Sequence, residues 1–150
     1  LLGCAALALR RLRALRRMET CPARAACAHL LRAAQEGIAF AFRYGVDIMR
    51  ESGLRAGVIR AGHANLFLSP LFRSTLATLC DANIELYNTD GALGAARGAA
   101  LGAGLYRNRN EAFASLCRIE EVHPDPAIRH VLEETYQIWK KELQLQLENQ

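Results

Sequence analysis

GVIRAGHANLFLSPLFR (residues 57–73) and NIELYNTDGALGAARGAALGAG (residues 83–104) are the two stretches that decide the fold. Each has the pattern of a short apolar strand, a glycine-punctuated turn and a helix, which predicts two strands joined by a helical crossover. The strands of such a unit run parallel, so the turns that follow them lie at the same edge of the sheet. Ligands of open α/β sheets bind at this edge, and backbone N–H groups beside glycine suit phosphate. The sequence therefore predicts a phosphate-binding site formed by the two turns.

Length and composition predict one soluble domain with a substantial core. The chain has 150 residues, of which 51% are hydrophobic and 23% are charged, as in ordinary globular proteins. The net charge of +4 comes from the beginning of the chain: residues 1–17 carry five arginines and no acid, whereas 14 basic residues face 15 acidic ones from Glu19 onward. The chain from Glu19 onward is therefore nearly neutral, and it has no interleaved aromatic and basic residues. Both features argue against nucleic acid as a partner.

Residues 1–22 form a head rich in Leu, Ala and Arg, which we leave unassigned. Its apolar run of nine residues is too short to span a bilayer, which takes about 20. Its arginines follow this run, whereas a secretory signal carries its positive charges first. An organelle transit peptide stays an alternative, but we favour the truncated or mistranslated end of a longer reading frame. We therefore expect a fragment of a larger protein, with no membrane partner.

Cysteine and histidine spacing argues against a disulfide framework or a metal site. The five cysteines are odd in number and form no C-x-x-C pair, which favours reduced thiols in a cytoplasmic protein. His29, His123 and His130 have no partner at a metal-ligand spacing. The adjacent glutamates at 120–121 and 133–134 point apart, so no facing pair of catalytic carboxylates is predicted.

The segment before the first turn predicts a long helix, and the segment after it predicts a shorter one. Residues 24–52 read as one helix or two abutting ones, with Gly53 as the left-handed stop. Ser69 and Pro70 predict the N-cap and first turn of a helix that runs to about Cys80. The apolar face of the long helix, spaced by three and four residues, comprises Ile38, Phe42, Val46 and Met49.

The two short strands are expected at Val58–Arg60 and Ile84–Tyr87, and Asp90 is expected to cap the next helix. Each glycine in a helix interior costs about 1 kcal/mol of stability, so a helix face of glycines needs a favourable contact that offsets this cost. We expect that face to pack closely against another element. Its glycines are Gly94, Gly98 and Gly102.

The C-terminal part predicts one short helix and one long covering helix. Asn110 is expected to cap the short helix, which ends at Cys117 and is followed by a loop. The last helix spans about residues 127–147 and is charged on its outer face. Its apolar stripe comprises Ile128, Leu132, Tyr136, Trp139, Leu143 and Leu147.

These segments together resemble the C-terminal domain of the FGGY carbohydrate kinases, in the xylulokinase-like branch of that family. The resemblance covers roughly residues 24–148, and we identify residues 23–150 as the C-terminal part of that domain. The run Leu-Gly-Ala-Ala at 93–96 is its most specific part. The matching segments are EGIAFAFRYGVDIMRESG (36–53), AGHANLFLSPLFRSTLA (61–77) and DGALGAARGAALGAG (90–104).

The resemblance implies an α/β fold: a partial ribonuclease H-like domain of the actin-like ATPase type, helix-rich with a short parallel sheet. It also implies an enzyme, a kinase that uses ATP and Mg²⁺ to phosphorylate a ketose such as xylulose. No segment here resembles the catalytic aspartate motif of the family, and nothing resembles its sugar-binding domain. We therefore expect no catalytic residue in this chain, no sugar phosphorylation by the chain alone, and an N-terminal kinase domain as its partner. The sequence specifies neither the sugar nor the oligomeric state.

In relatives the glycine turn after the first of these strands contacts the nucleotide, which carries over to Gly62, His63, Ala64 and Asn65. Ala61 departs from the family pattern, where glycine is usual, so the nucleotide geometry can differ here. Other interpretations stay open: His63 as a surface hydrogen-bonder, Asn65 as the residue that closes its own turn, and Asp90 as an N-cap and not a magnesium contact. The alternative function is a non-catalytic nucleotide-binding or regulatory module of the same fold.

Overall fold

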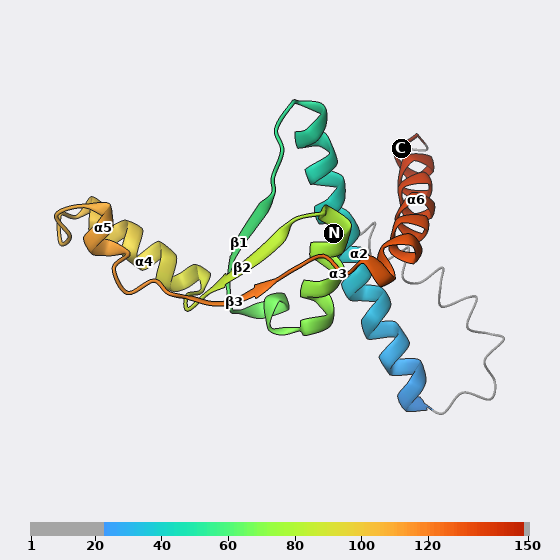
Figure 1. Ribbon diagram of the computed structural model, residues 1–150, viewed down its shortest axis with the longest axis horizontal. Coiled ribbons are helices and arrows are strands. Elements are labelled where there is room, and N and C mark those ends of the chain that lie inside the picture. Colours follow the sequence, from blue (N-terminus) through green and yellow to red (C-terminus); the bar gives the residue numbers. More distant parts are fainter. Residues whose placement is uncertain (1–22, 149–150) are drawn as a thin grey trace.

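The computed structural model describes residues 23–148, which form helices and a small three-stranded sheet. The head at 1–22 and the last two residues of the expected domain lie outside the described residues. The helix-rich α/β character expected from the sequence is confirmed. The elements, in chain order, are α2 (Ala23–Glu51), β1 (Val58–Gly62), a 3-10 helix (Asn65–Leu68), α3 (Pro70–Cys80), β2 (Asn83–Tyr87), α4 (Gly91–Gly102), α5 (Arg109–Ala112), β3 (Arg118–Val122) and α6 (Pro126–Glu148). The helices α2, α3 and α6 lie on one side of the sheet, and α4 and α5 project away from it (Figure 1).

The sheet is mixed, which corrects the expectation of a short parallel sheet. β1 and β2 pair in parallel, with Gly62 opposite Tyr87, as the two strand–turn–helix units predict. β3 pairs antiparallel with the other side of β2, so β2 lies in the centre. Residues 118–122, Arg-Ile-Glu-Glu-Val, do not predict a strand because polar and apolar residues do not alternate. Four of the five are exposed, and charged side chains are typical of an edge strand.

The predicted starts of α3 and α4 are confirmed by their caps. The side chain of Ser69 accepts a hydrogen bond from the backbone N–H of Phe72 (3.3 Å), and that of Asp90 accepts one from Leu93 (2.7 Å). After α2, Gly53 has the predicted left-handed conformation, with φ of 83°. The sequence therefore specifies where these helices begin and end.

The short helix α5 differs from its prediction in both its cap and its length. Asn108, and not Asn110, is the cap, because its side chain accepts a hydrogen bond from the N–H of Glu111 (3.0 Å). The helix ends at Ala112 after one turn. The chain from there to Cys117 is irregular and leads into β3.

The core lies where α2, α3 and α6 pack on one another and on one face of the sheet. In the predicted stripe of α6, Leu132, Tyr136 and Trp139 are buried and Ile128 and Leu143 are half-buried, but Leu147 is 57% exposed. In α2, Val46 is buried as predicted, whereas Phe42 and Met49 are 50% and 41% exposed, which is a correction. The reason is that α2 directs Phe40 toward the aromatic rings of α6 instead. The main core residues are Ala39, Phe40, Val46, Phe72, Leu76, Leu79, Ile84, Leu86, Leu132, Tyr136 and Trp139.

The glycine face of α4 does not pack as predicted. A Cβ atom added at Gly94, Gly98 or Gly102 would meet no atom within 4 Å. α4 and α5 extend away from the sheet, on the side opposite α2 and α6 (Figure 1). The prediction of close packing is therefore wrong for residues 23–148. In the same part of the chain, no helix is long and apolar enough to cross a membrane.

Candidate functional site

The turns that follow β1 and β2 lie side by side at the carboxyl ends of the two strands. The backbone N–H of His63 donates to the carbonyl oxygen of Tyr87 (2.9 Å), which also accepts a hydrogen bond from the N–H of Thr89 (2.8 Å). One carbonyl group thus joins the two turns, and the shared edge predicted from the sequence is confirmed. This edge is where parallel sheets bind their ligands.

Gly62 is required by the close approach of the second turn. A Cβ atom at this position would lie 2.3 Å from the carbonyl oxygen of Thr89 and 3.3 Å from the Cα atom of Asp90. A non-bonded carbon and oxygen do not come that close, so any larger residue forces the two backbones apart. The fold therefore needs glycine here whether or not a ligand binds.

An open hollow of about 380 Å³ lies between these strand ends. The ring of Tyr87 and small or aliphatic side chains provide its apolar surface, and the guanidinium of Arg60, which is 71% exposed, places a positive charge beside it. An apolar surface with a few polar groups is typical of small-molecule sites. The combination is chemically suited to a small ligand that has an apolar part and an anionic group. The lining residues are Arg60, Ala61, Gly62, Tyr87, Thr89 and Leu116.

Of the four residues that the resemblance assigns to ATP, only Gly62 lines the hollow, and the other three continue the turn beyond it. His63 and Asn65 are exposed, and Ala64 is half-buried. Asn65 has φ of 53°, a left-handed conformation that asparagine adopts more readily than most residues. Its amide has no hydrogen-bond partner among residues 23–148, so it is available to a ligand. Ala61, the departure from the family pattern, packs against the core.

A carboxylate, that of Glu85, orients two of the polar side chains that line the hollow, Arg60 and Tyr87. Glu85 lies 2.8 Å from Nε of Arg60, accepts a hydrogen bond from the hydroxyl of Tyr87 (2.9 Å), and lies 3.2 Å from Nη1 of Arg118. The hydrogen bond from Arg60, followed by that from Tyr87, holds the pKa of Glu85 below its usual value. The carboxylate therefore stays ionised at neutral pH and keeps both partners in place.

Arg97 of α4 is buried without a carboxylate partner among residues 23–148. It is 8% exposed, and it donates hydrogen bonds to the hydroxyl of Ser115 (3.0 Å) and, more weakly, to that of Thr89 (3.4 Å). Charged side chains are rarely buried unless they are paired. This guanidinium fixes the second turn through Thr89 and adds positive charge close to the hollow.

The acidic and histidine side chains near the turns have structural roles or lie apart from one another. Residues 23–148 contain no group of three His, Cys, Asp or Glu side chains placed to hold a metal ion. Asp90 of the second turn accepts a hydrogen bond from Leu93 (2.7 Å), in agreement with its N-cap interpretation. His29 and His123 are exposed, and His130 lies 3.6 Å from Glu134. Kinases bind Mg²⁺ largely through the phosphates of ATP.

The sequence predicts the two turns as the site but does not single out four individual residues: Arg60, Tyr87, Thr89 and Arg97. For Tyr87 and Thr89 a usable signal exists, because they lie at the carboxyl end of a predicted strand. For Arg60 the signal would be its partner Glu85, which pairs with it only across the sheet. For Arg97 no signal exists, since periodicity in a helix of small residues does not indicate which side is buried.

The fold is similar to part of a known kinase. No family model matches the chain, and no curated protein does. The crystal structure of xylulose kinase from Rhodospirillum rubrum matches with a TM-score of 0.58 and 27% sequence identity over 75% of this chain. The match covers 23% of the chain of that kinase. The chain thus has a kinase-like fold and spans less than a quarter of the length of the kinase that it resembles.

Proposed function

We propose that residues 23–150 form the nucleotide-binding part of an FGGY-type carbohydrate kinase. In this proposal the chain binds MgATP, and the complete cytoplasmic enzyme transfers the γ-phosphate to a ketose such as xylulose. The main support is the pair of turns joined at the carbonyl of Tyr87, in a chain whose fold is similar to part of a xylulose kinase. The same similarity supports the actin-like ATPase type of fold as part of the proposal.

Each residue of the site has a proposed role that follows from its position. Gly62 allows the backbones of the two turns to meet, and the turn from His63 to Asn65 contacts the nucleotide. Arg60, held by Glu85, contributes positive charge near the phosphates. Phosphoryl transfer depends mostly on positioning and charge neutralisation, and bound Mg²⁺ supplies further positive charge to the phosphates.

The proposal assigns the remaining chemistry to an N-terminal kinase domain. That domain provides the carboxylate that accepts the proton of the sugar hydroxyl, and it provides the sugar pocket. The chain described here contributes the wall of the active site that faces the nucleotide. This division of roles follows from the family resemblance, in which no matched segment carries the catalytic aspartate motif.

Replacing Asn65 with glycine is expected to weaken the binding of MgATP by roughly two- to tenfold, as for the loss of one hydrogen bond of about 0.5–1.5 kcal/mol. Glycine adopts positive φ without strain, so the turn keeps its conformation (φ 53° at this position) while the amide is lost. Calorimetric titration of MgATP into the parental chain and the variant measures the change.

The variant Asn65→Asp keeps the shape of the side chain and brings a negative charge near the phosphates, so it is expected to weaken binding more than Asn65→Gly does. If both variants bind MgATP as tightly as the parental chain, Asn65 only shapes its turn. If the parental chain does not bind MgATP at all, the proposed function itself is wrong.

A further inference from the structure

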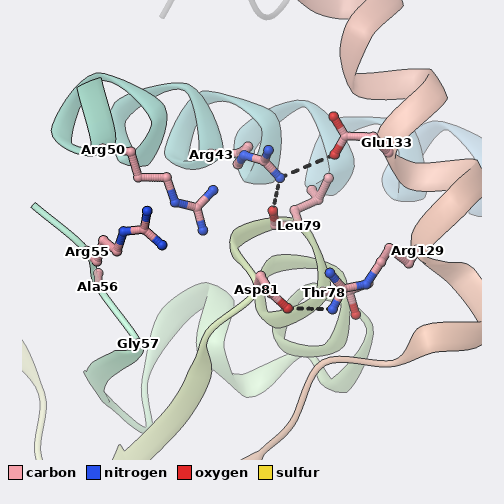
Figure 2. A pocket seen from close by; sticks show the side chains of 10 residues that line it. All are labelled: Arg43, Arg50, Arg55, Ala56, Gly57, Thr78, Leu79, Asp81, Arg129 and Glu133. Atoms are coloured by element: carbon pink, nitrogen blue, oxygen red, sulfur yellow. Dashed lines mark hydrogen bonds and ion pairs between the residues drawn. The ribbon is translucent and has the colours of Figure 1, made fainter. Parts of the chain in front are cut away.

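A second hollow, of about 590 Å³, lies at the opposite end of β1 from the two turns (Figure 2). It is bounded by the C-terminal part of α2, the segment that enters β1 at Gly57, the end of α3 and the first turns of α6. Its charged lining comprises Arg43, Arg50, Arg55, Arg129, Asp81 and Glu133. Four guanidinium groups face these two carboxylates, and Asp47, which pairs with Arg43 and Arg50 from beside the hollow, is a third; one positive charge remains in excess.

Two of these arginines have a structural role. Arg43 and Arg50 donate hydrogen bonds to the carbonyl oxygens of Leu79 and Cys80 at the end of α3, and cations stabilise the C-terminus of a helix. Asp47 lies 2.7 Å from Nε of Arg43 and 3.4 Å from Nη1 of Arg50. Burial alone would raise the pKa of this aspartate, but hydrogen bonds, first from Arg43, outweigh burial and hold the pKa below its usual value.

The structural role does not account for the rest of the positive charge. Arg129 pairs with Asp81 at the rim of the hollow. Arg55 lies in the segment between α2 and β1, and it has no hydrogen-bond or ion-pair partner among residues 23–148. In Figure 2 the guanidinium groups of Arg50 and Arg55 extend into the same space, and none of the acidic residues drawn stands between them. Two like charges that share a cavity repel each other, and an anion between them removes that repulsion.

We propose that this hollow binds a phosphate group, either as inorganic phosphate or as the phosphate of a small phosphorylated molecule, between Arg50 and Arg55. The guanidinium fork matches phosphate oxygens with paired, charge-assisted hydrogen bonds. The volume of about 590 Å³ exceeds what a phosphate ion fills and falls in the range of small-molecule sites. The site is separate from the proposed nucleotide site, because Gly57 and Gly62 lie at opposite ends of β1.

Titration calorimetry with inorganic phosphate, and separately with glucose 6-phosphate, tests this site on the 150-residue chain. We expect saturable binding that weakens as salt concentration rises and that persists in the presence of saturating MgATP. Arg55→Gln is expected to weaken it at least tenfold, about 1.4 kcal/mol, without unfolding the chain, since Arg55 has no structural partner among residues 23–148. The tighter of the two probes identifies free or esterified phosphate as the source.

Arg109→Gln is the matched control, because Arg109 is an exposed arginine of α5, which does not line the hollow and lies on the other side of the sheet from α2 and α6 (Figure 1). It is expected to leave phosphate binding unchanged. The site is disproved if neither probe binds, if Arg55→Gln binds as the parental chain does, or if MgATP displaces the phosphate. Displacement by MgATP would mean that phosphate binds at the two turns, and it would not contradict the proposed function.

Discussion

Replacing Gly62 with valine is expected to lower the free energy of unfolding by about 1–3 kcal/mol or more, the range for overpacked positions. The physical reason is a collision within the chain, since a Cβ atom would lie 2.3 Å from the carbonyl oxygen of Thr89. Backbone atoms cannot rotate away as a side chain can, so the two turns must separate. The hollow between them then changes shape, and we expect MgATP to bind at least tenfold more weakly, about 1.4 kcal/mol.

Gly98→Val is the matched control for this substitution. A Cβ atom at Gly98 meets nothing within 4 Å, and valine is a slightly better helix former than glycine. This variant is expected to be as stable as the parental chain or slightly more stable, with unchanged MgATP binding. Denaturant unfolding measures stability and calorimetry measures binding. A Gly62→Val chain with parental stability would contradict the contact between the two turns.

Replacing Tyr136 with alanine is expected to cost about 3–5 kcal/mol of unfolding free energy, as for large aromatic residues in cores. Tyr136 is fully buried, and its ring centroid lies 5.9 Å from that of Phe40 and 6.0 Å from that of Trp139. Its hydroxyl donates to Asp47 (2.8 Å), and the guanidinium of Arg43 lies 5.2 Å above its ring. The substitution therefore removes the ring–ring, hydrogen-bond and cation–π contacts that Tyr136 makes with α2. Against a total stability of about 5–15 kcal/mol for a typical domain, it brings the chain close to unfolding.

Two controls separate packing from hydrogen bonding at Tyr136. Tyr136→Phe keeps the ring and removes only the hydrogen bond to a charged group, so we expect a smaller cost of about 1.5–3 kcal/mol. Ile138→Ala changes a residue of the same helix that is 64% exposed, and its cost is expected within about 0.5 kcal/mol. Denaturation curves in urea give all three values. If Tyr136→Ala costs no more than Ile138→Ala, α6 is not held by this aromatic cluster.

Local signals in the sequence predict the helices and the parallel strand pair because the interactions that define them are local. Ser69 with Pro70 begins one helix, Asp90 caps the next, and Gly53 ends the long one. The two strand–turn–helix patterns predict parallel strands, and the register of β1 on β2 agrees. The third strand, 118–122, escapes prediction because an exposed, charged edge strand carries no alternating pattern.

The candidate site is less predictable because its contacts join residues that are distant in the sequence. Gly62 is recognisable as a turn glycine, but the approach of Thr89 that requires it appears only in three dimensions. Arg60 and Glu85 pair across the sheet at 2.8 Å, 25 residues apart. The glycine face of α4 shows a second limit. Glycines spaced four residues apart predict close packing, but within residues 23–148 a Cβ atom added at any of them meets no atom within 4 Å. The spacing alone does not say which element packs there.

The most direct test of the central claim is a titration of the isotopically labelled chain with MgATP, followed by NMR spectroscopy of its backbone amides. The claim predicts that the largest changes occur at the two turns, from His63 to Asn65 and from Tyr87 to Asp90, whose backbones meet at the carbonyl of Tyr87. Amides beside Arg50 and Arg55 should change little. Changes confined to the arginine-lined hollow, or no changes at millimolar MgATP, would contradict the claim that this chain binds a nucleotide through its paired strand-end turns.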